Sequence, residues 1–213
     1  MNYWFLYNLS DGSIFGAPYL GIAEEWTNIP SGCGVLGPLP KDSAPEEVVD
    51  AFNNPQYYMV QNDELVQKPD YAASLLEDVK ARKIAELDQM CNQTILAGFT
   101  SSALGAPHQY DFDEEAQRNF AGTLALLNVD STITSITWKT VDAGPLTHTR
   151  DQFIQLCRDA FNFKDSQIQK YWSKKNQVLQ STTVDQVNAI TWDDPTPVAS
   201  TPVASTPVAS TPI

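Results

Sequence analysis

The sequence predicts an α+β fold: a small, mostly β N-terminal module, a helical domain with a β-hairpin inserted between helices, and an extended Pro-rich tail. Residues 1–70 are rich in Gly, Pro and aromatic side chains, whereas residues 71–192 carry apolar side chains at helical spacing. Residues 193–213 repeat Thr-Pro-Val-Ala-Ser, and a proline every five residues prevents both a helix and a strand interior. We therefore expect three parts, with these boundaries.

Turn signals in the N-terminal module predict two strand pairs and one short helix. Asp11-Gly12 is a strong hairpin dipeptide, and Asn62-Asp63 separates two apolar runs. Pro45 suits the first position of a helix. The expected elements are strands at 2–8 and 13–16, a helix at 45–52, and strands at 57–60 and 65–66, with no long helix in the Gly- and Pro-rich segment 30–40.

The first strand carries large apolar side chains on both faces, namely Tyr3, Trp4, Phe5 and Tyr7. Such a strand is either buried on both sides or contacts another chain. We expect it to contact a partner, and a core private to the module is the alternative.

Apolar residues at three- and four-residue steps predict the helices of the second domain. Gly98 has the position of a C-cap, and Thr149 with Gln152 has the spacing of a capping box. The expected elements are a helix at 71–97, a loop at 99–110, a helix that begins at 111–115, a strand at 132–140 that turns at 142–144 and returns at 146–148, a helix from 149 to about 178, and a short amphipathic turn at 184–190.

Trp138 is expected to be a core residue rather than a ligand-binding one. It shares a strand face with Ile136, and the flanking helices offer Phe120, Leu124 and Phe153 as neighbours.

The charge balance excludes some classes of partner. The chain has 13 Lys and Arg against 26 Asp and Glu, which gives a formal charge of −13. Affinity for nucleic acids and for anionic membranes comes from basic residues, so we expect neither partner. The N-terminal segment lacks the pattern of a signal peptide and no apolar run is long enough to span a membrane, so we expect a protein that is not secreted.

No catalytic, cofactor-binding or metal-binding residue is predicted. The three cysteines have no C-x-x-C spacing, and no nucleotide-binding or G-x-S-x-G motif occurs. His148 is expected at the surface of a hairpin. His108 lies near the acidic residues that open the second helix, where a metal site is possible but a solvated helix start is the simpler interpretation.

A series of residues in the second domain occurs in a characteristic order. It runs Arg82, Ile84, Leu87, Cys91, Ile95 and Gly98-Phe99, then Tyr110, Phe112-Asp113, Asn119 and Gly122, then Ile136-Thr137-Trp138-Lys139-Thr140 and Asp142, and then the helix after Leu146. This series, from roughly 78 to 190, resembles a domain of unknown function found in bacteriophage tail-fibre and tail-fibre-associated proteins. The first 70 residues, with their aromatic strand, Asp-Gly turn and Pro30-Ser31-Gly32, resemble the N-terminal part of phage tail-fibre assembly proteins.

The resemblance implies a non-enzymatic structural component of a phage tail, at the baseplate or the fibre attachment, made in the host cytoplasm and located in the virion. Its partners would be other tail or fibre proteins, in a homo-oligomer or a symmetric assembly. The alternatives are a tail-fibre assembly chaperone and an enzyme that acts on cell-surface glycans through Asp111 and Asp113. The resemblance carries over no catalytic residue and no cofactor.

The tail offers a second set of contact residues. Val198, Val203, Val208 and Ile213 recur every five residues and could dock along a repeating groove of a partner. The alternative is a passive tail.

Overall fold

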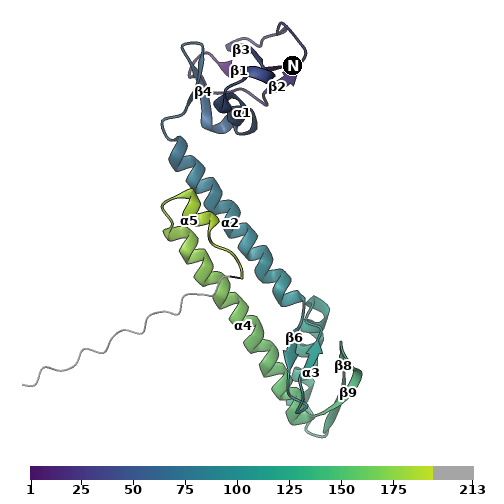
Figure 1. Cartoon of the computed structure of the whole chain (residues 1–213). Coiled ribbons are helices and arrows are strands. Elements are labelled where there is room, and N and C mark those ends of the chain that lie inside the picture. The colour runs from purple at the N-terminus through teal and green to yellow at the C-terminus, as the bar shows by residue number, and fades with distance from the viewer. Residues whose placement is uncertain (194–213) are drawn as a thin grey trace, which may run out of the picture. The chain divides into compact units, whose positions relative to one another are not determined.

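The computed structural model describes residues 1–193, so the tail residues 194–213, with the expected contacts at Val198, Val203, Val208 and Ile213, lie outside the described residues (Figure 1). The described chain forms two compact units and confirms the predicted α+β fold. The first unit comprises Met1–Ala81 with Thr182–Val184, and the second comprises Arg82–Ser181 with the chain from Asp185. The first boundary falls inside helix α2 (Tyr71–Leu96) rather than at its start.

A three-stranded antiparallel sheet of order β2-β1-β3 organises the first unit. Its strands are β1 (Asn2–Asn8), β2 (Tyr19–Gly21) and β3 (Cys33–Pro40). The expected return strand at 13–16 forms only isolated bridges, among them one between Tyr7 and Ile14. The principal partner of β1 is instead β3. No strand was expected there, because segment 30–40 is rich in proline. An edge strand tolerates proline because one side of it makes no ladder hydrogen bonds.

Helix α1 and a second hairpin complete this unit. The remaining elements are the 3₁₀ turns η1 (Lys41–Ser43) and η2 (Pro55–Tyr57), helix α1 (Glu46–Asn53), and strands β4 (Tyr58–Gln61) and β5 (Glu64–Gln67). Asn62 and Asp63 both have positive φ, at 53° and 59°, as a tight hairpin turn requires. The predicted helix and the predicted second strand pair are therefore confirmed.

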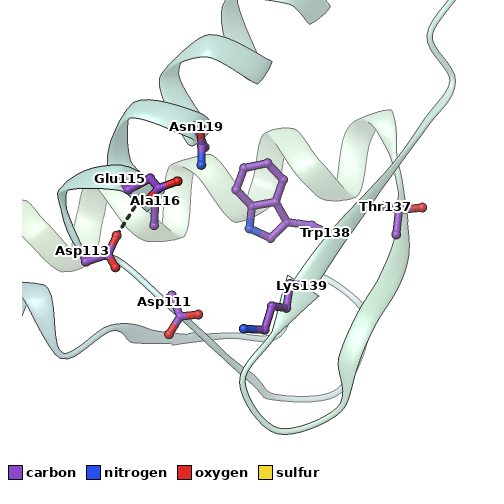
Figure 2. Close-up of a pocket in the computed structure, with 8 residues that line it drawn as sticks. All are labelled: Asp111, Asp113, Glu115, Ala116, Asn119, Thr137, Trp138 and Lys139. Atoms are coloured by element: carbon purple, nitrogen blue, oxygen red, sulfur yellow. Dashed lines mark hydrogen bonds between the residues drawn. The ribbon is translucent and has the colours of Figure 1, made fainter.

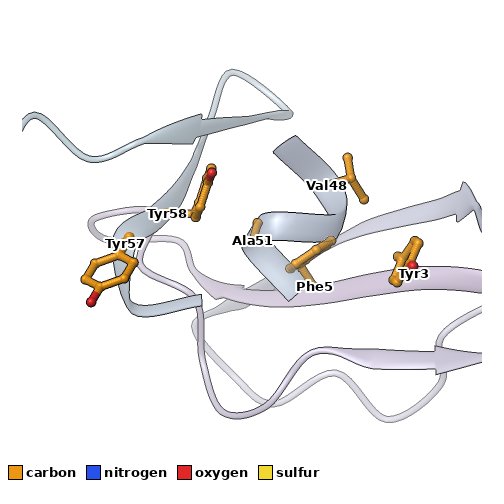
Figure 3. Close-up of a cluster of buried hydrophobic side chains, with 6 residues drawn as sticks. All are labelled: Tyr3, Phe5, Val48, Ala51, Tyr57 and Tyr58. Carbon is orange, nitrogen blue, oxygen red and sulfur yellow. The ribbon is translucent and has the colours of Figure 1, made fainter. Parts of the chain in front are cut away.

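The expectation that the aromatic strand contacts a partner is wrong for three of its four residues. The exposed fractions of Tyr3, Trp4 and Phe5 are 5%, 3% and 0%. Tyr3 and Phe5 pack with Val48, Ala51, Tyr57 and Tyr58 in the core of the unit (Figure 3). On the other face, the ring centroid of Trp4 lies 6.2 Å from that of Trp26. The module itself therefore covers both faces of β1, and of these four residues Tyr7 alone is half-buried.

The second unit places two hairpins among its helices. Its elements are the later part of α2, β6 (Phe99–Ser101) and β7 (His108–Tyr110), α3 (Glu114–Val129), β8 (Ser135–Thr140) and β9 (Gly144–Thr149), α4 (Arg150–Gln180) and α5 (Val184–Asn188). The hairpin between α3 and α4 and the capping box of Thr149 and Gln152 are confirmed. Segment 99–110, expected as a loop, is the β6–β7 hairpin, because three-residue strands are too short to show an alternating pattern.

Aromatic side chains hold the hairpins against the helices in this unit. The ring centroid of Phe99 on β6 lies 6.0 Å from that of Phe120 on α3, and that of Trp138 on β8 lies 5.0 Å from that of Phe153 on α4. Phe153 on α4 has no exposed surface. The packing of these hairpins against α3 and α4 positions the candidate site.

Candidate functional site

A hollow of about 430 Å³ opens between the start of α3 and strand β8 (Figure 2). We call it the Trp138 hollow. Its lining residues are Asp111, Asp113, Glu115, Ala116 and Asn119 on the α3 side, and Thr137, Trp138 and Lys139 on the β8 side.

Trp138 is fixed in orientation by two aromatic contacts. Its ring centroid lies 4.6 Å from that of Phe120 and 5.0 Å from that of Phe153. The predicted inward facing towards these two residues is therefore confirmed. The side chain is only half-buried, however, and it lines the hollow with Asn119 on one side and Lys139 on the other. The expectation of a purely core residue is wrong, because the strand lies at the edge of the unit and leaves part of the indole uncovered.

The hollow combines an aromatic wall with an excess of negative charge. Asp113 caps α3, since its Oδ1 accepts a hydrogen bond from the backbone N–H of Ala116 at 2.7 Å. Three carboxylates face a single ammonium group, that of Lys139. A cation or a planar polar group suits such a lining, because the indole face and the carboxylates both attract positive charge. Within residues 1–193, no group of three or more His, Cys, Asp or Glu side chains is arranged to hold a metal ion.

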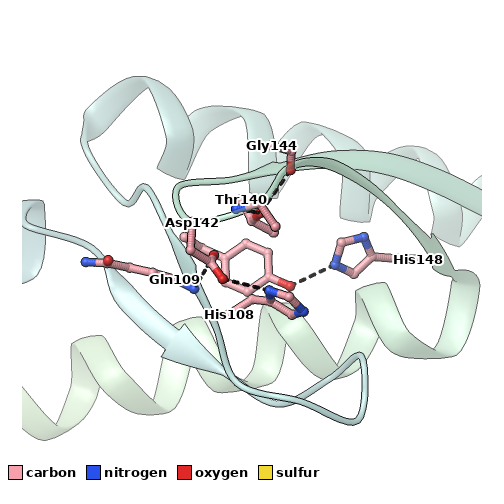
Figure 4. Close-up of polar contacts among 8 residues, drawn as sticks. His108, Gln109, Thr140, Asp142, Gly144 and His148 are labelled. Atoms are coloured by element: carbon pink, nitrogen blue, oxygen red, sulfur yellow. Dashed lines mark hydrogen bonds and ion pairs between the residues drawn. The ribbon is translucent and has the colours of Figure 1, made fainter.

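Behind the hollow, His148 is fully buried, which corrects the expectation of a surface histidine. Its Nδ1 lies 3.1 Å from the carbonyl oxygen of Leu146. Its Nε2 lies 2.9 Å from the hydroxyl of Tyr110, a hydrogen bond drawn as the dashed line at His148 in Figure 4. The carbonyl can only accept, so Nδ1 carries the proton and Nε2 accepts from the Tyr110 hydroxyl. Burial lowers the pKa of His148 below its ordinary value and raises the pKa of Tyr110, to which the charges of Asp142 and Asp159 add.

His108 pairs with a residue that the sequence did not associate with it. Its Nδ1 lies 2.9 Å from Oδ2 of Asp142, and the Oδ1 of Asp142 accepts the backbone N–H of Gln109 at 3.0 Å. These two hydrogen bonds, that from His108 first, hold the pKa of Asp142 below its usual range. The side chain of His108 on strand β7 is thus paired with a carboxylate of the β8–β9 turn.

An apolar groove runs between α3 and α4 on the same unit. It has a volume of about 410 Å³ and is lined by Leu124, Ile154, Cys157, Arg158, Phe161 and Asn162. We call it the α3–α4 groove. Phe161 is 69% exposed beside it, which is unusual for so large an apolar side chain. Burial raises the pKa of the Cys157 thiol to about 11, so this cysteine is a poor nucleophile at neutral pH.

Neither the hollow nor the groove was found from the sequence. The lining residues of the hollow come from two separate stretches of the chain, 111–119 and 137–139, and only the packing of β8 beside α3 brings them together. The exposed Phe161 lies within an apolar helical stripe that periodicity alone assigns to the core. No helix in the described part of the chain is long and apolar enough to cross a membrane.

Comparison with known proteins gives one match. No curated protein and no solved structure matches the chain. Residues 78–191, just over half of the chain, match the family described as a domain of unknown function, DUF4376. This match spans the later part of α2 and the elements that build both the Trp138 hollow and the α3–α4 groove. The chain therefore belongs to the DUF4376 family.

Proposed function

We propose that this protein is a non-enzymatic structural component of a bacteriophage tail, at the baseplate or the fibre attachment, that acts through protein–protein contacts. The resemblance of residues 78–190 to a domain of phage tail-fibre-associated proteins supports the proposal. Its partners are other tail or fibre proteins within a symmetric assembly, and its location is the virion. Nucleic acids and membranes are not among its partners, in keeping with a formal charge of −13.

The observation that carries a contact function is the apolar surface of α3 and α4. Phe161, which lines the groove, is a large exposed apolar side chain, and α3 exposes two more, Leu126 and Val129, outside the lining of the groove. Exposed apolar surface of this kind is typical of protein–protein interfaces, since covering it removes hydrocarbon from water.

Virion composition tests the proposal directly. Mass spectrometry of purified particles is expected to find the protein in stoichiometric amounts, and its absence from particles would contradict a structural role. Phe161→Ser is expected to reduce incorporation into particles. Trp172→Ser, which alters a side chain on the same helix that is 52% exposed but outside the groove, is the matched control and should incorporate normally.

Purified particles also distinguish the two alternatives, an assembly chaperone and an enzyme. A chaperone would be absent from particles, and fibre protein expressed without it would stay insoluble. An enzyme that uses Asp111 and Asp113 would lose infectivity when both are changed to Asn. We expect that double variant to stay folded, because Asn replaces Asp well as the cap of α3, and to infect normally.

A further inference from the structure

We infer that the hydrogen bond between Tyr110 and His148 is an acid-sensitive brace that holds the two walls of the Trp138 hollow together. Tyr110 is the last residue of β7 and directly precedes Asp111, the first residue of the α3 wall. His148 lies on β9 opposite Ile136 of β8, two residues before Trp138. The bond therefore joins the wall that leads into α3 to the hairpin that carries the indole.

Both ring nitrogens of His148 are engaged in the neutral state. Nδ1–H donates to the carbonyl of Leu146, and Nε2 accepts the hydroxyl proton of Tyr110. Adding a proton to Nε2 places two hydrogens against each other unless the hydroxyl turns away, and it creates a charge on a side chain with no exposed surface. The hydroxyl then turns and accepts from Nε2–H, so the link persists only with a charge held at a buried site, and protonation weakens the brace that the neutral ring makes.

The surroundings of the ring do not compensate such a charge. Phe153 of α4 packs edge-on at 6.4 Å between ring centroids. Burial lowers the pKa of His148 by more than the hydrogen bond to the carbonyl of Leu146 raises it, and the charge of His108 on β7 lowers it further. The carboxylates of Asp142 and Asp159 face Tyr110, but Asp142 is bonded to His108, and Asp159 accepts the hydroxyl of Ser101 at 2.5 Å.

A second link between the same hairpins does not depend on His148. The backbone N–H of Val141 donates to the carbonyl of Gln109 at 2.7 Å, and the backbone N–H of Gln109 donates to Oδ1 of Asp142 at 3.0 Å. Mild acid therefore weakens the inner, buried link while the outer link holds. The predicted result is a loosened hollow in a chain that remains folded.

The lowered pKa of His148 determines how the stability of the fold changes with pH. Above pH 6.5, the ordinary histidine value, the ring is neutral in the folded and the unfolded chain, so the brace contributes fully. Below pH 6.5 the unfolded chain binds one proton more, and the unfolding equilibrium constant rises about tenfold per pH unit. The rise stops once the pH falls below the pKa of the folded state.

Two-dimensional NMR of the full chain tests the inference, because the chain has only two histidines and five tryptophans. His108→Gln assigns the ring signals, and Trp138→Phe assigns the Trp138 indole N–H. Between pH 7 and pH 4.5, we expect the Trp138 signal to shift with the same midpoint as the His148 ring, below pH 6.5. The tenfold rise per pH unit is expected in the wild type and in His108→Gln, but not in His148→Gln.

The inference is overturned if the His148 ring titrates at or above pH 6.5, or if the Trp138 signal does not follow it. If His148→Gln does not fold, Tyr110→Phe provides the test. That variant removes the hydroxyl that links His148 to β7, so the Trp138 signal should no longer shift with the His148 ring; a Trp138 signal that still follows the ring would also overturn the brace.

Discussion

At the residue scale, the degree of burial decides how much a side chain contributes to the free energy of unfolding. Trp138→Ala removes an indole that packs on Phe120 and Phe153 but keeps one side open to the hollow. Truncating a fully buried Trp costs about 3–5 kcal/mol, so we expect this half-buried one to cost about 2 kcal/mol. Denaturant unfolding followed by circular dichroism measures the loss. Trp172→Ala, on the exposed side of α4, is the control and should change stability by less than about 0.5 kcal/mol.

Two glycines of the same unit are expected to respond in opposite directions to the same substitution. Gly98 has φ +95°, and a Cβ there would lie 2.4 Å from the carbonyl oxygen of Tyr110. Gly98→Ala is therefore expected to cost at least about 2 kcal/mol, from the left-handed backbone and the clash. Gly122 lies inside α3, and nothing lies within 4 Å of an added Cβ. Gly122→Ala should stabilise by about 1 kcal/mol, and a loss of stability there would contradict the open environment.

At the element scale, the start of α4 depends on a reciprocal pair of hydrogen bonds. The backbone N–H of Gln152 donates to Oγ1 of Thr149 at 3.2 Å, and Oε1 of Gln152 accepts the backbone N–H of Thr149 at 2.9 Å. Thr149→Ala removes the first bond and is expected to lower the free energy of unfolding by about 1 kcal/mol. Thr147→Ala, at an exposed position of β9, leaves the cap intact and should have little effect; equal losses in the two variants would argue against the capping box.

The elements also differ in how far their sequences specify them. Helices α3 and α4 are capped by Asp113 and Thr149, whose side chains accept backbone N–H groups within the first turn. Such caps depend on neighbours a few residues away and can therefore be predicted from the sequence. Strand β3 and the hairpin of β6 and β7 were missed, because their stability comes from a partner strand and from packing rather than from local preference.

At the scale of the whole molecule, two units each build a hydrophobic core within residues 1–193. Removing residues 194–213 is therefore expected to leave the melting temperature unchanged while weakening incorporation into virions. Calorimetry and particle mass spectrometry measure the two effects. A lower melting temperature would show that the tail takes part in the fold, and normal incorporation would reduce it to a passive tail.

The sequence by itself determined the fold class, the capped helices and the turn at Asn62-Asp63, since each depends on residues close together in the chain. Only the tertiary structure decided which side chains are buried and which meet. Packing against α1 and the start of β4 buried Phe5 inside the module, and packing of two hairpins joined Tyr110 to His148 across 38 positions. Local pattern cannot specify such contacts, because a side chain on a strand has the same sequence signature whether its own fold or another chain covers it.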